Sequence, residues 1–455
     1  MKIASIKQKW YWVLGLLGGV GFIANVLTFY PGYMSNDTLS QLGQALGSQE
    51  LNDMLPLAMM GLWRLLIAVT GHASAMLFFQ LLLLWLGVGL LAVYVFRETG
   101  SRKYSLLPFA IGILPVILNI SGVVWKDNQM AFALFLACVL ILFFKYIHGV
   151  YGRIGLLVTS LMLMVYACLV RYNALIAIVP LMFLAFRQSG FIKTRSRQVL
   201  ASLGMIVVTV SCFSLMSFAF NSKSSNPVSF VMLDDVVNVT SSGVLGSSSL
   251  SPDFKEDIRE VQECARSKKM LVNNYWVCAN EEQRERFSLS NFSGLKELWM
   301  KTLVSNPLDY MLYKTQSYVS FLFPAEGVYY VWQDGIEPNE FGQEVKFERP
   351  GEIVGIYVNN FGYKNFHFMY EPWFWLAACI GLFVYMKKNR NTDSIILLIV
   401  SSAALYLLSY FPTGATVDYR FIYWSVLACV TVSILLVVKR INRRPKNTRS
   451  KSRAR

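Results

Sequence analysis

Histidine is scarce in this chain. Among 455 residues only His72, His148 and His367 are histidine, and they lie far apart in the sequence. Zinc sites in proteins are built from His and Cys ligands at short characteristic spacings. We therefore expect no His-based zinc site, and no pattern in the chain calls for another metal or for a cofactor. A phosphate-binding loop of the G-x-x-x-x-G-K-[ST] type is also missing, which argues against ATP hydrolysis.

Charge is the second scarce property. Only 15% of the residues are charged, whereas 55% are hydrophobic and 14% are aromatic. A soluble chain of this length would be far more polar, so the composition indicates an all-α polytopic membrane protein. The formal net charge of +15 would fit a nucleic-acid-binding protein. We reject that interpretation because the excess of Lys and Arg lies in the short loops and in a tail that directly follows a hydrophobic run.

Ten hydrophobic runs are visible, most of them close to the 17–25 residues that cross a bilayer as a helix. They are 11–29, 74–96, 104–122, 128–147, 154–170, 174–187, 198–220, 371–386, 394–411 and 421–438. The first run follows a basic start but precedes no small-x-small cleavage site, which predicts an uncleaved anchor. We therefore expect about ten transmembrane helices.

Acidic residues are almost missing from every second connection. Of 27 Asp and Glu residues, only Glu98 and Asp393 fall in the short connections that are rich in Lys and Arg. Those connections and the flanking segments carry Lys2, Lys7, Lys9, Arg97, Arg102, Lys103, Lys145, Arg153, Arg187, Lys193, Arg195, Arg197, Lys387, Lys388, Arg390 and the tail from Lys439 to Arg455. Basic loops stay in the cytoplasm, so both termini are predicted to be cytoplasmic.

This orientation places two large segments outside. In the first, about 30–73, Leu39, Leu42 and Leu46 recur at helical spacing, which predicts a helix over 37–46 capped by Ser35 or Asn36. A second helix is expected over 55–69, lying along the membrane surface. If it crossed, the basic loops that follow it would be on the outside.

The second outside segment, about 221–370, is predicted to be a mixed extracytoplasmic domain. It holds aromatic clusters at 318–323 and at Tyr329, Tyr330 and Trp332, which suit sugar stacking or packing on the membrane surface. Cys264 and Cys278 lie in it and could form a disulfide in an oxidising compartment. Asp234 and Asp235 lack the spacing of a nucleotide-sugar motif and are predicted to be loop surface.

The chain thus divides into four parts. Residues 1–220 form an N-terminal transmembrane module that contains the first outer loop, and 221–370 form the extracytoplasmic domain. Residues 371–438 supply the C-terminal transmembrane helices, and 439–455 are a basic cytoplasmic tail. The cysteines at 138, 168, 212, 379 and 429 lie in the hydrophobic runs, where we expect them to be packing residues.

Four sites at the outer ends of the runs collect polar side chains, and ionisable groups at membrane depth usually face a bundle interior or a water-filled cavity. The residues are Asp37 and Asp53, then Trp125-Lys126-Asp127, then Arg171-Tyr172-Asn173, and finally Asp418-Tyr419-Arg420. We expect all four sites to face one cavity. Asp37 has no Lys or Arg near it before Arg64, so its charge needs a partner from elsewhere in the fold or from a substrate.

Arg171 is the only charged residue between Ile154 and Phe186. At about 1.5 Å per residue this stretch spans roughly 50 Å, which barely suffices for two crossings and a turn. Arg171 must therefore lie near the hydrocarbon boundary, where it could bind a phosphate in a bidentate manner or serve as a snorkelling anchor. Lys126 with Asp127, and Asp418 with Arg420, could likewise be simple ion pairs.

Taken in order, these segments resemble those of the C-type glycosyltransferases, membrane enzymes that take a sugar from a polyprenyl-phosphate carrier. The resemblance lies in Tyr30-Pro31-Gly32 with Ser35-Asn36-Asp37, in 53–63, and in the three triplets at 125–127, 171–173 and 418–420. The segments resemble those of uncharacterised bacterial members, or of members that modify O-antigen, lipopolysaccharide or other cell-surface glycans. Asp53 departs from the family pattern, since Met54-Leu55-Pro56 follows it in place of a His-Pro or Pro-Pro pair.

The resemblance implies a reaction and a location. Asp37 would be the general base of an inverting hexosyl transfer, while Lys126, Arg171 and Arg420 would bind the donor phosphate. Asp53, Asp127, Asn173, Asp418 and Tyr419 would contact the substrate or orient the cations. The partners would be a polyprenyl-phosphate-linked sugar, a glycan or lipid-linked glycan acceptor and membrane lipid, at the outer face of a bacterial cytoplasmic membrane.

Three other functions remain open from the sequence. A flippase or transporter of a lipid-linked glycan would use the same cations without a base, although its polar residues would line both sides of the bilayer. An O-antigen-ligase-type transferase would be expected to use Arg and His of the large loop, where His367 is the only histidine. A non-catalytic scaffold would need none of these side chains.

Overall fold

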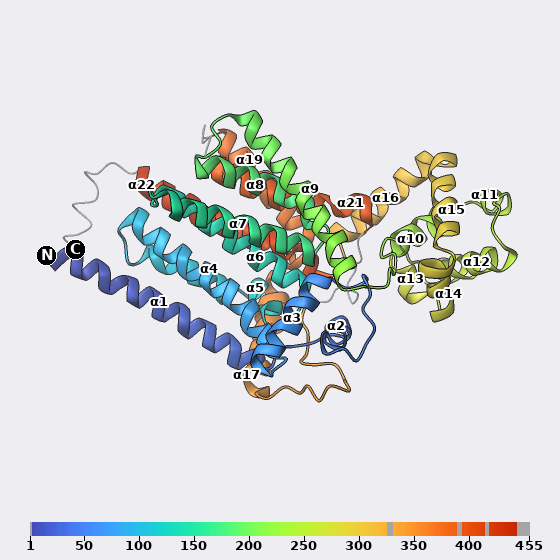
Figure 1. Cartoon of the computed structure of the whole chain (residues 1–455), viewed down its shortest axis with the longest axis horizontal. Coiled ribbons are helices and arrows are strands. Elements are labelled where there is room, and N and C mark those ends of the chain that lie inside the picture. The colour runs from blue at the N-terminus through green and yellow to red at the C-terminus, as the bar shows by residue number, and fades with distance from the viewer. Residues whose placement is uncertain (1, 325–330, 389–393, 415–417, 444–455) are drawn as a thin grey trace.

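The computed structural model describes residues 2–324, 331–388, 394–414 and 418–443. Within these ranges the chain is helical, with only isolated β-bridges and no named strand. A long bundle at one side carries the hydrophobic runs, and a separate group of helices projects from its far end (Figure 1). Tyr329, Tyr330, Asp393, Arg390 and the tail beyond Arg443 fall outside the described residues.

All ten hydrophobic runs lie in helices. The bundle consists of α1 (Lys2–Phe29), α4 (Ala75–Thr99), η1 (Tyr104–Gly112) with α5 (Pro115–Ser121), α6 (Lys126–Leu142) with η2 (Phe143–Lys145), α7 (Val150–Val170), α8 (Ala174–Ser189), α9 (Arg195–Ala219), α19 (Pro372–Lys388), α20 (Ser394–Leu408) and α22 (Tyr423–Arg443). Among the described residues seven helices are long and apolar enough to cross a membrane, or nine if two bent pairs each count as one span. The remaining run is α8, which is shorter and contains Pro180.

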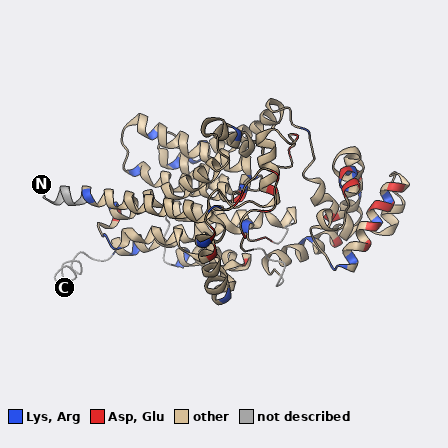
Figure 2. Cartoon of the chain, turned by 90° about the horizontal axis from the view of Figure 1, so that it is seen from below, with Lys and Arg blue, Asp and Glu red and all other residues tan. Residues whose placement is uncertain are grey.

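The start of α1 and the end of α22 lie at one end of the bundle (Figure 1), which we call the terminal end. Asp and Glu residues are concentrated in the projecting helices at the opposite end (Figure 2). This separation of charges is the pattern from which the orientation was predicted. Which end faces the cytoplasm remains a prediction.

The first outer segment forms two helices, as predicted. α2 (Asn36–Leu46) begins after Ser35 and buries Leu39 and Leu42. α3 (Leu57–Thr70) begins after Pro56 and has 14 residues, which is too short to meet the length required of a span. Arg64 on α3 donates to the carbonyl oxygens of Gln44 and Ala45, which close the last turn of α2. The two helices therefore hold each other at the end of the bundle opposite to the terminal end, which we call the outer end after its predicted side.

The projecting helices have a hydrophobic core of their own, built around Leu233, Phe254, Phe287 and Leu298. They are α10 (Ser229–Val239), α11 (Ser242–Gly246), α12 (Pro252–Ser267), α13 (Asn274–Val277), α14 (Glu281–Glu285), η3 (Arg286–Ser290) and α15 (Phe292–Ser305). We call this group the outer domain. A disulfide joins Cys264 of α12 to Cys278, as an oxidising compartment would permit.

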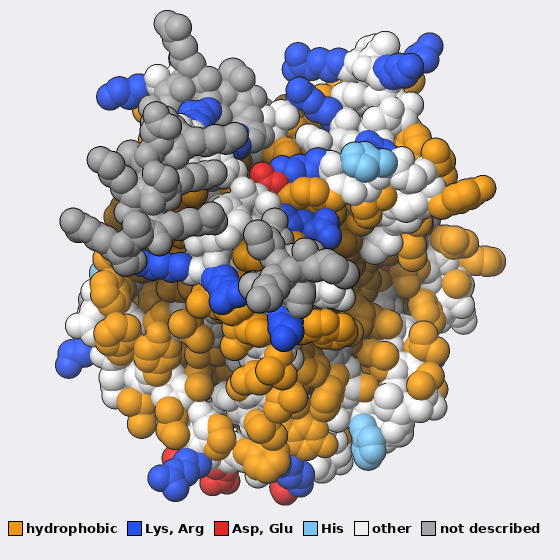
Figure 3. Space-filling view, turned by 90° about the vertical axis from the view of Figure 1, so that its left-hand side faces the viewer, with side chains coloured by type: hydrophobic (Ala, Val, Ile, Leu, Met, Phe, Trp, Pro, Cys, Tyr) orange, Lys and Arg blue, Asp and Glu red, His pale blue; other side chains and the backbone are white. Residues whose placement is uncertain are grey.

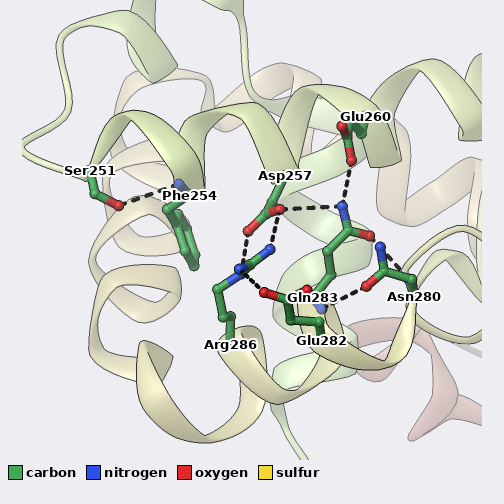
Figure 4. Close-up of polar contacts among 8 residues, drawn as sticks. All are labelled: Ser251, Phe254, Asp257, Glu260, Asn280, Glu282, Gln283 and Arg286. Carbon is green, nitrogen blue, oxygen red and sulfur yellow. Dashed lines mark hydrogen bonds and ion pairs between the residues drawn. The ribbon is translucent and has the colours of Figure 1, made fainter.

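Charged side chains also fix α12 against α14 (Figure 4). Arg286 forms a fork with Asp257, at 2.8 Å from Nε and 2.8 Å from Nη2, and bonds Glu282 through Nη1. Gln283 donates to Asp257 and Glu260 and forms a reciprocal capping box with Asn280. Ser251 caps the first turn of α12 through the Phe254 amide. Some acidic residues of this domain, namely Asp257, Glu260 and Glu282, therefore have a structural role.

Asp234 and Asp235 are not loop surface, so that prediction was wrong. Both are buried on α10. Asp234 accepts hydrogen bonds from the backbone amides of Asn273 and Asn274, and Asp235 pairs with the buried Lys314 at 2.5 Å. Each carboxylate is tolerated in the interior because a specific donor compensates its charge.

The rest of the large outer segment returns to the bundle. α16 (Pro307–Leu322) leads back from the outer domain, and a bent path follows through α17 (Glu348–Ile356), η4 (Tyr357–Tyr363), α18 (Lys364–Phe366) and η5 (His367–Tyr370). Residues 331–337 pass beside the first outer segment, where Met34 and Ile336 form a bridge. The remaining elements are α21 (Tyr410–Thr413) and η6 (Tyr419–Ile422).

Candidate active site

Four segments that are distant in sequence meet at the outer end of the bundle. Asp37 lies in the first turn of α2, and Lys126 and Asp127 lie in the first turn of α6. Arg171 follows the last residue of α7, and Asp418 and Arg420 stand at the start of η6, which leads into α22. The structure thus brings together all three predicted cations and three of the predicted acids.

Backbone pairing holds α2 against the start of α6. The Tyr33 amide donates to the Gly122 carbonyl, and the Val124 amide donates back to Tyr33. Thr38 of α2 donates its hydroxyl to Val124 at 2.9 Å. Gly122 is required here because a Cβ atom would lie 1.9 Å from the Phe29 ring. The first residues of both helices are therefore fixed side by side.

Arg420 lies at the centre of a charged group that consists of Asp37, Lys126, Asp127, Arg171, Asp418 and Arg420 itself. Its Nη1 atom lies 3.0 Å from Asp37, and its Nε atom lies 2.9 Å from Asp418. The guanidinium stacks at 4.9 Å over the Trp125 ring, and the Trp125 indole N–H donates to Ser35. Asp37 thus finds its partner 383 residues away in the chain, as the lack of a local cation required.

Arg171 forms a deeper pair. Its Nε atom is 3.0 Å from Asp127, whose side chain is fully buried, and its Nη2 atom donates to the Tyr410 hydroxyl at 3.3 Å. The guanidinium lies 4.6 Å from the centre of the Phe421 ring, and Arg420 lies 5.4 Å from the same ring. Arg171 therefore forms a structural ion pair with Asp127, and it also lies beside the other cations of the site.

Lys126 differs from the two arginines. Asp127 pairs with Arg171 rather than with Lys126. Among the described residues no carboxylate lies within ion-pair distance of the Lys126 amine, although Arg171, Asp37, Asp127 and Arg420 act on it electrostatically. Lys126 also stands at the N-terminus of α6, where the first backbone amides and the helix dipole favour anions. It is the cation most available to an incoming phosphate.

The Asp37 carboxylate is poised at the surface of this group, with 51% of its side chain exposed. Burial of the carboxyl acts to raise its pKa, but Arg420, Lys126 and Arg171 outweigh that effect and hold the pKa below its usual value. Asp418 shows the opposite balance, since burial raises its pKa to about 6 against the effect of Arg420. Asp37 is therefore ionised at neutral pH, and its side chain is the most exposed of the three carboxylates in this group.

The other predicted residues lie around this group in different roles. Asp53 accepts hydrogen bonds from the amide and hydroxyl of Ser225 and from Ser224, so it fastens the first outer segment to the chain after α9. Asn173 is the N-cap of α8, beside Arg171 in the sequence, and its side chain makes no capping bond. Tyr419 is fully buried, and its hydroxyl donates to the Val116 carbonyl.

Two site residues were missed in the sequence. Phe421 lies beneath both guanidinium groups, and Tyr410 connects Arg171 to a stack with Phe321 of α16. An aromatic residue directly after Arg420 was a visible signal for Phe421. Tyr410 carried no signal, because only the fold places it beside Arg171.

No family model matches the chain, and no curated protein matches it. Among solved structures, the chain is similar to ArnT from Cupriavidus metallidurans bound to undecaprenyl phosphate, with 14% sequence identity. The similarity covers 93% of this chain and 76% of that chain, with a TM-score of 0.35. A similarity of this size assigns no function to the chain.

Proposed function

We propose that the protein is an inverting membrane glycosyltransferase that moves a sugar from a polyprenyl-phosphate donor to an acceptor at the outer face of a bacterial cytoplasmic membrane. The observation that carries the proposal is the half-exposed Asp37 carboxylate held against Arg420, beside Lys126, with which no carboxylate of the described residues forms an ion pair. In such a transfer the carboxylate would act as the general base, and the cations beside it would stabilise the negative charge on the departing lipid phosphate.

The resting pair suggests how the donor would engage. A phosphate approaching Lys126 competes with Asp37 for Arg420, since both are anions seeking the same guanidinium. Once the phosphate holds Arg420, Asp37 loses its closest cation and gains a negative neighbour. Both changes raise the pKa of the Asp37 carboxyl and make it a stronger base.

The acceptor hydroxyl oxygen attacks the anomeric carbon while its proton moves to Asp37. The bond between that carbon and the phosphate oxygen breaks, and the polyprenyl phosphate leaves with the electron pair. Lys126 and Arg420 stabilise the charge that grows on the phosphate, and Arg171 adds a more distant positive charge. Attack from the face opposite to the phosphate inverts the anomeric configuration.

Substitution Asp37→Asn tests this proposal. It removes the base but keeps the shape, so we expect sugar transfer from a polyprenyl-phosphate donor to fall by roughly 10²- to 10⁴-fold. Binding of polyprenyl phosphate, measured by native mass spectrometry, should be kept or strengthened because a competitor for Arg420 is gone. The control is Asp309→Asn, an exposed acid on α16, which should transfer normally.

The outcome also separates the competing functions. A transporter of a lipid-linked glycan or a scaffold would keep its activity with Asn at this position, because neither needs a base. An O-antigen-ligase-type transferase would depend instead on Arg and His of the large outer loop, where the histidine, His367, pairs with Glu371. Normal activity of the Asp37→Asn protein would contradict the proposal.

A further inference from the structure

A second basic site lies at the terminal end of the bundle, far from Asp37. Three cations line a cavity of about 430 Å³ there: Arg187 near the end of α8, Lys193 in the loop before α9, and Arg195 as the first residue of α9. α8 runs from beside Arg171 to this cavity, so its 16 residues separate the two sites by about 24 Å. The cavity therefore takes no part in the chemistry proposed above.

The lining is divided into a charged and an apolar part. Phe183, Leu397 and Leu398 form the apolar wall, and Gln198 and Ser394 add polar groups. All three cationic side chains are exposed. In the part of the chain that the structure describes, none of them forms an ion pair, whereas the nearby Arg153 donates all its hydrogen bonds to backbone carbonyl oxygens. Three cations that no described carboxylate neutralises, beside an apolar wall, are suited to an anion that carries a hydrocarbon chain.

The loop that carries the cations is held in place by the protein itself. Arg153 donates to the carbonyl oxygens of Gln188 and Ser189 at its start, and Gly190 turns the chain with a φ of +71°. Gln198, 6% exposed, donates to the Ile192 carbonyl at 2.7 Å from the other side. Arg153 and Gln198 thus supply the hydrogen bonds that the loop carbonyl oxygens accept. The three cations are not needed for that purpose and can bind a ligand.

We infer that this cavity binds the phosphate group of an anionic phospholipid, with the acyl chain along the apolar wall between α8 and α20. Arg and Lys recognise phosphate through charge-assisted hydrogen bonds. Basic pockets between transmembrane helices are suited to anionic headgroups at the bilayer surface. The site lies on the end seen in Figure 3, where Lys and Arg side chains surround a broad apolar surface.

The test uses the full chain in nanodiscs of phosphatidylcholine with or without phosphatidylglycerol. The cavity variant combines Arg187→Gln, Lys193→Gln and Arg195→Gln. The matched control combines Lys9→Gln, Lys103→Gln and Arg197→Gln, three exposed cations of the same end that do not line the cavity. Both variants change the net charge equally, so a difference between them reports the site rather than the surface charge.

We expect the cavity variant to bind phosphatidylglycerol roughly 10-fold or more weakly by native mass spectrometry, and the control to stay close to the wild type. Equal losses in the two variants, or no loss in either, would overturn the inference. Inorganic phosphate alone is the second probe. If it binds the cavity as tightly as phosphatidylglycerol, the ligand is a free phosphate and the lipid assignment is wrong.

A measurement on the wild-type chain covers the case in which the cavity variant does not fold. A photoactivatable phosphatidylglycerol should label residues 183–198 and 394–398, as located by peptide mass spectrometry. Labelling spread evenly over the terminal end, or absent from these residues, would contradict the site. Neither readout depends on sugar transfer, so a failed transferase proposal leaves the lipid site untouched.

Discussion

Individual side chains at the outer end of the bundle divide into those that hold the site together and those that remain available. Arg171 and Asp127 belong to the first kind, because a fully buried carboxylate needs its cation. Lys126 belongs to the second kind, since no carboxylate of the described chain pairs with it. Arg420 belongs to both, because it binds Asp418 within the protein and Asp37 at the surface.

This division predicts different consequences for two neighbouring cations. Arg171→Gln leaves Asp127 buried without a partner and should lower the free energy of unfolding by about 3–5 kcal/mol, lowering the melting temperature in detergent. The double variant Asp127→Asn with Arg171→Gln should regain much of that loss. Lys126→Gln should melt close to the wild type but bind polyprenyl phosphate more weakly.

The roles assigned to Arg171 and Lys126 would be contradicted if the two variants showed the opposite stabilities. If Lys126→Gln unfolded the protein and Arg171→Gln did not, the roles assigned to the two cations would be exchanged. A double variant no more stable than Arg171→Gln alone would show that the two side chains do not compensate each other.

Among the elements, α16 links the outer domain to the site. Lys314 on α16 forms a buried pair with Asp235 of α10, and the Trp299 indole donates to the same carboxylate at 2.8 Å. Further along α16, Phe321 stacks on Tyr410, whose hydroxyl accepts a bond from Arg171. One helix therefore contacts both the outer domain and a residue of the charged group.

Breaking the ion pair between Lys314 of α16 and Asp235 of α10 should weaken the attachment of the outer domain to α16. Lys314→Met leaves the buried Asp235 carboxylate without its cation, at a cost of about 3–5 kcal/mol. We expect limited proteolysis to cut between α15 and α16 sooner than in the wild type. Lys223→Met is the control, because its pair with Glu50 is exposed on both sides and contributes only about 0–1 kcal/mol. Equal protease resistance in both variants would refute the link.

At the scale of the whole molecule, the helices could be predicted well from the sequence, whereas the ion-pair partners of the charged side chains could not. Hydrophobic length and periodicity located the ten helical runs, α2 and α3, because these signals are local. The pairing of Asp37 with Arg420 and of Asp127 with Arg171 depends on how the bundle closes, which one sequence does not encode locally. The burial of Asp234 and Asp235 was missed for the same reason, since Lys314 and Asn274 lie far along the chain.

The predicted orientation can be tested across the whole molecule by labelling. Ser48→Cys lies on an exposed turn after α2 and should react in intact cells with a thiol reagent that does not cross the cytoplasmic membrane. Lys103→Cys, exposed at the terminal end, should react only after the membrane is opened. The opposite result would place Asp37 in the cytoplasm and remove the need for a lipid-linked donor.

The most direct measurement is an experimental structure of the protein with polyprenyl phosphate bound. The account predicts that the phosphate lies within hydrogen-bond distance of Lys126 and Arg420, and that the Asp37 carboxylate has moved away from Arg420 to face the acceptor side. A phosphate bound elsewhere, or an Asp37–Arg420 pair that stays closed beside a bound phosphate, would contradict it.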